Sequence, residues 1–252
     1  MQLVKKAGPI VVALASYFAV KAFFFDTVAA KDVESEQLEH ALMQADHGEF
    51  FQVLKAGFPQ EFHTFIEELT EVVNQEHADK QQKSIAVRTS SAAFTAELRR
   101  ENAHYLRQTP ADLLRALHRS KLDLLLAVQD DPALCNKVAQ LSAAALSANE
   151  MNDQRQAILF EGSIVVLNSI VAGRDHPVER KQATEEDYAD FLAEWRKQSD
   201  VTPSMFETLM KDDASSGDYC ASMTSFQRYS VAATGRSAER VLAELSVLTE
   251  AR

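Results

Sequence analysis

The sequence has few residues that break helices and no convincing β-strand pattern. Its 252 residues include seven glycines and six prolines. The best strand candidate, residues 163–171, lies inside a longer helical pattern. Alanine, leucine, glutamate and glutamine are abundant, and apolar residues recur three and four positions apart. These patterns predict an all-α protein, a multi-helix bundle preceded by an N-terminal hydrophobic helix.

The sequence also lacks the common motifs of catalytic and cofactor sites. It has no P-loop, no GxGxxG, no GxSxG and no HExxH. A carboxylate-bridged di-iron bundle uses two Glu-x-x-His turns, and this chain has one, from Glu101 to His104. We therefore predict no catalytic residue, no cofactor and no metal site. Because helical bundles can build a site from residues on several helices, an enzyme or a small-ligand binder with a pocket between helices stays an alternative.

Cysteine is scarce, since Cys135 and Cys220 are the two in the chain. Their separation excludes the CxxC spacing of redox and zinc motifs. In an exported protein such a pair is most simply a disulfide, and a loop of this length would stabilise the fold by about 4 to 5 kcal/mol in the chain-entropy model. In a reducing cytoplasm both would be small, buried apolar residues. The prediction of a disulfide therefore depends on the compartment.

One apolar stretch, residues 7–25, decides the predicted compartment. It holds nineteen residues with one charge, Lys21, and it directly follows the basic Lys5 and Lys6. About 20 apolar residues can cross a bilayer as a helix, and basic residues at one end favour keeping that end in the cytoplasm. We predict an uncleaved membrane anchor with the rest of the chain on the non-cytoplasmic side.

Two alternatives explain the same stretch. It could be a signal peptide cleaved near Ala30, although the bulky residues 23–25 disfavour cleavage there. It could also be the first helix of a soluble cytoplasmic regulator, buried in its core. In terms of domains, we assign residues 1–30 to an anchor or signal segment and residues 31–252 to a helical domain.

The net charge of −11 is unevenly distributed along the chain. An acidic chain lacks the basic surface that nucleic-acid binding requires, so we predict no nucleic-acid partner. Residues 26–79 carry a net charge of −11, whereas residues 80–121 carry +6. Such opposite charges are most simply complementary faces of neighbouring helices. One basic face could instead bind an anion through charge-assisted hydrogen bonds: Arg99, Arg100, His104 and Arg107.

Helix-start signals place the helices along the domain. A capping residue followed by proline is typical of a helix N-terminus. We assign the cap role to Thr109, before Pro110, and predict further helix starts at residues 130–132 and 201–203. Thr184 is predicted to cap a further helix. The leucine-rich helix over residues 111–129 is expected to be central to the bundle. The helix that starts at Pro59 has an apolar stripe that predicts a core face: Phe62, Phe65, Ile66, Leu69 and Val73.

Glycines and polar segments predict the breaks between helices. Gly48 is expected to interrupt the first helix and to leave residues 50–54 in a short apolar turn. Gly173 is expected to terminate the helix before it. Residues 174–183 are the best linker candidate and could subdivide the domain. The last helix, residues 237–250, carries its apolar residues on one stripe: Val241, Leu242, Leu245 and Leu248.

These observations predict a domain that is anchored by residues 7–25 in a membrane and faces away from the cytoplasm. We expect a bacterial inner membrane and the periplasm, because the anchor is short and the exported part has no Asn-x-Ser/Thr acceptor. The expected role is interaction or scaffolding. The anchor would confine the domain to two dimensions, and helix grooves or charged faces would engage a protein partner.

Overall fold

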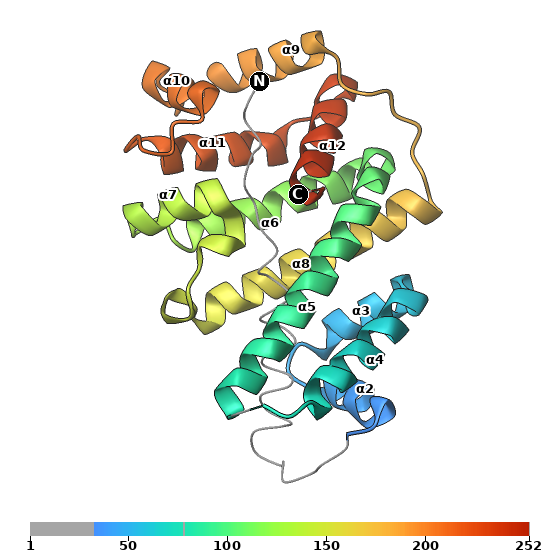
Figure 1. Cartoon of the computed structure of the whole chain (residues 1–252). Coiled ribbons are helices and arrows are strands. Elements are labelled where there is room, and N and C mark those ends of the chain that lie inside the picture. Colours follow the sequence, from blue (N-terminus) through green and yellow to red (C-terminus); the bar gives the residue numbers. More distant parts are fainter. Residues whose placement is uncertain (1–32, 78, 252) are drawn as a thin grey trace. The chain divides into compact units, whose positions relative to one another are not determined.

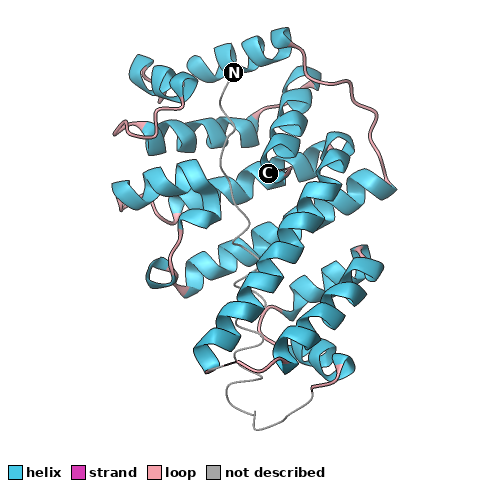
Figure 2. Cartoon of the chain, in the orientation of Figure 1, coloured by secondary structure: helices cyan, strands magenta, loops and turns pink. Residues whose placement is uncertain are grey.

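The structure, a computed structural model, is built from α-helices joined by loops (Figure 1, Figure 2). It describes residues 33–251 except residue 78. Within this part of the chain there is no strand, which confirms the all-α prediction. The predicted anchor, residues 7–25, and the alternative cleavage site near Ala30 lie outside the described residues.

The helices follow one another along the described chain with short connections. Three of them, η1, η2 and η3, are 3-10 helices. In order, the elements are α2 (Ser35–Gln44), α3 (Gly48–Gly57), α4 (Pro59–Asn74), α5 (Lys80–Asn102), η1 (Ala103–Gln108), α6 (Ala111–Leu126), α7 (Pro132–Leu141), η2 (Ser142–Ala145), η3 (Ala148–Glu150), α8 (Asp153–Asp175), α9 (Glu185–Arg196), α10 (Pro203–Lys211), α11 (Tyr219–Ala232) and α12 (Arg236–Glu250).

The described chain forms two compact units, one over residues 33–98 and the other over residues 99–251. The boundary between them falls inside α5, a helix without interruption. The subdivision that the sequence suggests near residues 174–183 lies inside the larger unit.

Aromatic side chains fill the core of the smaller unit. Phe50 and Phe51 of α3 and Phe62 and Phe65 of α4 are almost fully buried. The ring of Phe65 also stacks on Phe94 of α5, with the ring centroids 4.6 Å apart. The predicted core face of α4 is confirmed, because all five of its apolar residues are buried. Burial of each phenylalanine contributes roughly 1.5 to 3 kcal/mol to the stability of this unit.

Gly48 follows the break after α2 and is itself the start of a new helix. It is the first residue of α3, so the prediction of a short turn over residues 50–54 is wrong. The chain reverses at His47, which has a φ of 68°. A Cβ atom at position 48 would collide with the backbone carbonyl of Met43. The glycine is needed because the end of α2 and the start of α3 approach too closely for a side chain.

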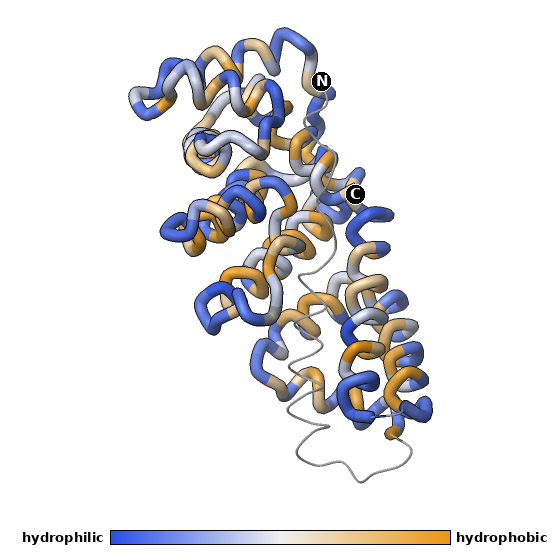
Figure 3. The backbone as a smooth tube through the Cα atoms, turned by 60° about the vertical axis from the view of Figure 1, so that its left-hand side comes forward, coloured by the Kyte–Doolittle hydropathy of each residue, from blue (hydrophilic) through white to orange (hydrophobic). Residues whose placement is uncertain are grey.

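The larger unit is arranged around α6, as the leucine-rich sequence predicted. This helix packs against both α8 and α11, and five of its leucines are at most 4% exposed. Figure 3 shows hydrophobic and hydrophilic residues interleaved along the helices, the pattern by which a helix buries one face and leaves the other in water. The buried leucines are Leu114, Leu117, Leu122, Leu124 and Leu125.

The cap predicted at Thr184 is confirmed, and so are the helix starts predicted at residues 130–132 and 201–203. The side chains of Asp131, Thr184 and Thr202 accept hydrogen bonds from backbone N–H groups in the first turns of α7, α9 and α10. Each cap satisfies a donor that the helix itself cannot pair and is worth about 1 kcal/mol. The cap predicted at Thr109 is wrong, because α6 begins after Pro110 and the Thr109 side chain has another partner.

Thr109 and Gly173 both serve a close contact between η1 and α8. The Thr109 Oγ1 donates a hydrogen bond to the carbonyl oxygen of Ser169, at 2.7 Å. Gly173 does not terminate α8, which continues to Asp175. A Cβ atom at position 173 would collide with the backbone carbonyl of Tyr105. The local sequence predicted that both residues mark helix ends. Their actual role is in the contact between η1 and α8, two segments that are distant in sequence.

The buried face of α12 differs from the predicted one. Val241 and Leu242 are buried as expected, but Leu245 is half-buried and Leu248 is 37% exposed. The other buried residues of this helix are mostly small or polar: Ala238, Ala243, Ser246, Val247 and Glu250. The helix is rotated in this way because its acidic residues pair with arginines of the surrounding elements.

Candidate functional site

The two cysteines lie in the larger unit at a distance suited to a disulfide. Cys135 is on α7 and Cys220 on α11, 85 residues apart in sequence, and their Cα atoms are 5.5 Å apart. Asn136, beside the first cysteine, links the same elements, because its side-chain oxygen accepts a hydrogen bond from the backbone N–H of Cys220 at 3.0 Å. Its Nδ2 donates to the carbonyl oxygen of Ser216 at 3.1 Å. The cysteine pair therefore lies where α7 and the start of α11 are also joined by hydrogen bonds.

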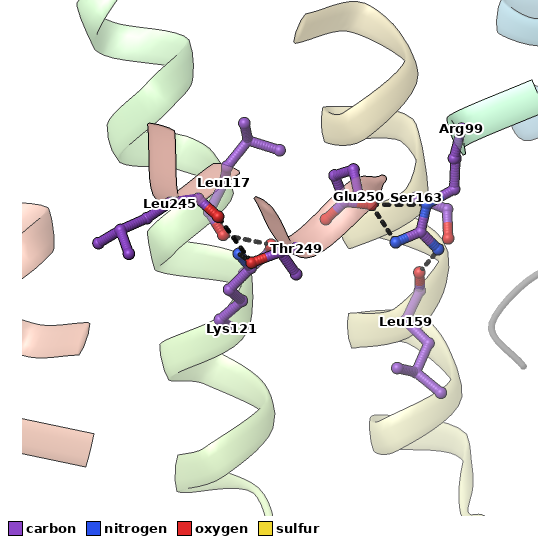
Figure 4. A network of polar contacts seen from close by, with 9 residues as sticks. Arg99, Leu117, Lys121, Leu159, Ser163, Leu245, Thr249 and Glu250 are labelled. Carbon is purple, nitrogen blue, oxygen red and sulfur yellow. Dashed lines mark hydrogen bonds and ion pairs between the residues drawn. The ribbon is translucent and has the colours of Figure 1, made fainter. Parts of the chain in front are cut away.

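Two of the arginines in the predicted anion-binding face are paired with carboxylates of α12. Arg99 donates from Nε to the Glu250 carboxylate at 2.6 Å and also from Nη2. Figure 4 shows the Arg99 side chain pointing at Glu250, next to α8. Arg107 donates from Nε and Nη2 to the two carboxylate oxygens of Glu244, at 2.9 and 3.1 Å. This bidentate geometry is the strong form of the arginine–carboxylate pair.

The other two members of that face are exposed. Arg100 is at the end of α5, and His104 is on η1, where its Nδ1 lies 3.0 Å from the carbonyl oxygen of Glu101. Anion binding by the four residues stays a prediction. The charges of Arg99 and Arg107, however, are already balanced within the chain. Their partners belong to the C-terminal helix and not to the acidic helices upstream, which the sequence favoured.

A third arginine, Arg180, holds the irregular segment between α8 and α9. Its side chain is 5% exposed, and Nη1 donates to the carbonyl oxygens of Arg107 and Thr109, at 2.6 and 3.0 Å. Nη2 lies 3.7 Å from Glu239 of α12. The backbone N–H of Val178 donates to the carbonyl oxygen of Gln108 at 2.8 Å. A cation at these carbonyls complements the C-terminal end of η1.

A fourth ion pair joins α9 to α12. The Asp187 carboxylate accepts hydrogen bonds from Arg240, from the Ser237 hydroxyl and from the backbone N–H of Thr184. These donors favour the charged form, with Arg240 contributing most, so the pKa of Asp187 lies well below its usual range. The four pairs surround α12 with fixed charge on several sides and specify one orientation for it.

His118 is a buried histidine in this unit that no sequence motif pointed to. It is 1% exposed on α6, and its Nδ1 lies 2.8 Å from the amide oxygen of Gln227 on α11. Nε2 has no partner with good hydrogen-bond geometry among the described residues. The sequence does indicate that His118 is buried, because it lies on the same helix face as Leu114 and Leu122, one turn away on either side.

The environment of His118 keeps its ring neutral. Burial is the main cause, the charge of nearby Lys121 adds to it, and together they lower the pKa of His118 from 6.5 to about 4. The hydrogen bond with Gln227 and the backbone of Leu242 oppose the shift. Figure 4 shows Lys121 directed to Thr249 of α12, whose hydroxyl accepts its hydrogen bond at 3.2 Å. The arrangement fixes α6 against α11 and α12.

The described residues contain no group of three or more His, Cys, Asp or Glu side chains placed to hold a metal ion. They contain one helix, α8, that is long and apolar enough to cross a membrane, and less than half of its apolar stretch is buried. Searches against protein-family models, curated proteins and solved structures give no match for this chain.

Proposed function

We propose that the chain is a membrane-anchored, non-cytoplasmic helical domain that acts as an interaction or scaffolding module. Residues 7–25 serve as the anchor, with Lys5 and Lys6 on the cytoplasmic side. The two helical units follow outside the cytoplasm. The site geometry supports a binding role better than catalysis, because the buried polar groups of the larger unit are used to fix helices against one another.

The cysteine pair is the observation that carries this proposal. The chain has two cysteines, and the fold brings them from positions 85 residues apart to a Cα separation of 5.5 Å. That separation is typical of disulfides. Disulfides persist in oxidising compartments and are rare in the cytoplasm. The pair therefore supports an address outside the cytoplasm, in agreement with a basic segment ahead of an apolar stretch at the N-terminus.

The charge of the smaller unit fits a spacer next to a membrane. Residues 33–98 carry a net charge of −8, and Lys55 is paired with Glu39 at 2.6 Å. Anionic lipid headgroups repel such a surface. The unit would therefore avoid lying flat on the bilayer and would leave helix faces of the chain accessible to a protein partner.

The test is fractionation of cells that express the full chain, combined with thiol labelling. We expect the chain in the membrane pellet after alkaline extraction. Under denaturing, non-reducing conditions we expect no labelling of Cys135 or Cys220, and labelling of both after reduction. Leu14→Arg places a charge in the middle of the stretch, which costs about 2.5 to 3.5 kcal/mol for insertion, and should release the chain from the membrane.

A second variant calibrates the labelling. Cys220→Ser leaves Cys135 alone, so it should accept one label without reductant. A soluble full chain with two reactive thiols would overturn the proposal, because it would remove the anchor and the oxidising compartment together. It would favour the soluble cytoplasmic regulator instead.

A further inference from the structure

The helix α8 has an apolar face that the larger unit leaves partly uncovered. Its inner face packs on α6 and η1, and the large residues there are buried: Leu159, Phe160, Leu167 and Ile170. The opposite side holds half-buried apolar residues together with the exposed Glu161 and Asn168. We define the outer face of α8 as these two polar residues with Ala157, Ile164, Val165, Val171 and Ala172.

Helical geometry confirms that these residues share one side. At 3.6 residues per turn, positions 157, 161, 164, 168, 171 and 172 fall within one stripe along the helix, and position 165 lies at its edge. A helix that is apolar on all sides is normally buried on all sides, yet less than half of the apolar stretch of α8 is buried. The outer face therefore has the composition of an interface.

Six of the seven residues of this face are arranged symmetrically about its centre, between Ile164 and Val165, and the seventh, Val171, has its counterpart in Ile158 beside the face. If a second α8 lies antiparallel with a two-fold axis at that point, each residue faces the one at the same distance beyond the axis. Ala157 then faces Ala172, and Ile164 faces Val165. Small residues meet small residues and branched residues meet branched residues, so the face is complementary to a copy of itself.

The two polar residues complete the match. In the same antiparallel pair, Glu161 of one copy faces Asn168 of the other, and the amide Nδ2 of an asparagine can donate a charge-assisted hydrogen bond to the carboxylate. The contact occurs twice by symmetry. In a parallel pair, Glu161 would face Glu161, and like charges at an interface are unfavourable. From this complementarity we infer that the outer face of α8 is a homodimer contact in which two copies of this chain pair antiparallel.

The size of the face sets the strength of the contact. Residues 157–172 span about 24 Å of helix at 1.5 Å per residue. A strip of that length and about 10 Å width is smaller than the roughly 800 Å² per partner of a stable complex. The dimer is therefore weak in dilute solution and forms at high local concentration, such as that provided by tethering to a surface. The inference itself does not depend on the anchor.

The first test is crosslinking of the purified full chain at about 100 μM with a short thiol-to-thiol reagent. Val165→Cys places a thiol beside the predicted axis, and Ala189→Cys places one at an exposed site on α9. We expect the crosslinked dimer to be at least fivefold more abundant for Val165→Cys than for Ala189→Cys or the unmodified chain. Equal yields would overturn the inference and would indicate that the face is covered by another segment or partner.

The second test exchanges charges in the Val165→Cys background. Asn168→Asp places two carboxylates opposite each other, and we expect at least a fivefold loss of crosslinked dimer. Adding Glu161→Lys to Asn168→Asp restores an opposite-charge pair, and we expect a yield within twofold of the parent. Both residues are exposed, so the fold should be kept, which circular dichroism checks. If Asn168→Asp has no effect, or if the double variant is not restored, the antiparallel pairing is wrong.

Discussion

Burial of His118 on α6 makes the free energy of unfolding depend on pH. The ring of His118 has a pKa of about 4 in the folded chain and an ordinary value of 6.5 when unfolded. The folded value is the lower one, so between these two values the unfolded chain binds a proton that the folded chain does not. The free energy of unfolding is therefore unaffected above about pH 7 and falls as the pH decreases through 6.5.

The magnitude follows from the shift. A difference of about 2.5 pKa units corresponds to about 3.4 kcal/mol once the pH is below both values. Between pH 7.5 and pH 5, the loss from this one group amounts to about 2 kcal/mol. That is a large fraction of the 5 to 15 kcal/mol that stabilises a typical domain. The contribution of this one group is isolated by comparison with a variant that lacks it.

The matched variant is His118→Gln, which is uncharged at every pH and can still hydrogen-bond with Gln227. We expect it to be less stable than the parent at pH 7.5, because it packs less well. The difference between the two should then shrink by about 2 kcal/mol as the pH falls to 5. Urea unfolding followed by circular dichroism at pH 7.5, 6.5, 5.5 and 5 measures it. A difference that stays constant within about 0.5 kcal/mol would refute the reasoning.

Three further predictions concern the contacts that hold the larger unit together. Gly173→Ala should destabilise it by about 2 to 4 kcal/mol in urea unfolding, because the new methyl group collides with the backbone carbonyl of Tyr105. The control Gly217→Ala, with open space around it, should cost less than about 1 kcal/mol. Reduction of the cysteine pair should lower the free energy of unfolding by up to about 4 to 5 kcal/mol while the native circular dichroism is kept, and an unchanged denaturation midpoint would contradict this. Arg180→Ala should cost about 2 to 4 kcal/mol and should make residues 176–184 a site of rapid proteolysis, which Arg196→Ala on α9 should not do.

Local signals in the sequence predict local structure well in this chain. Thr184 caps a helix as predicted, and helices begin where residues 130–132 and 201–203 predicted them, because a helix start needs only its own residues and the next turn of backbone. The core face of α4 is also predicted correctly, since a regular spacing of apolar residues determines which side of a helix can be buried.

The failures occur where a residue is used by a distant segment. Thr109 has the composition of a cap but bonds to Ser169, 60 residues away. Gly173 resembles a helix terminator, yet it is needed where another backbone passes. His118 meets Gln227 across 109 residues. The spacing of apolar residues predicts which face of a helix is buried, but it does not predict which polar group of another segment contacts that face. Most of the candidate site depends on such contacts.

The cysteine pair also has a topological consequence for the irregular segment anchored by Arg180. When Cys135 and Cys220 are joined, they close a loop that contains α8, α9 and α10. A protease that cut between α8 and α9 would produce two chain ends but no separate fragments, because the covalent loop would still connect them. In an environment rich in proteases, the larger unit could thus be cut once in this loop and still remain one covalently connected molecule.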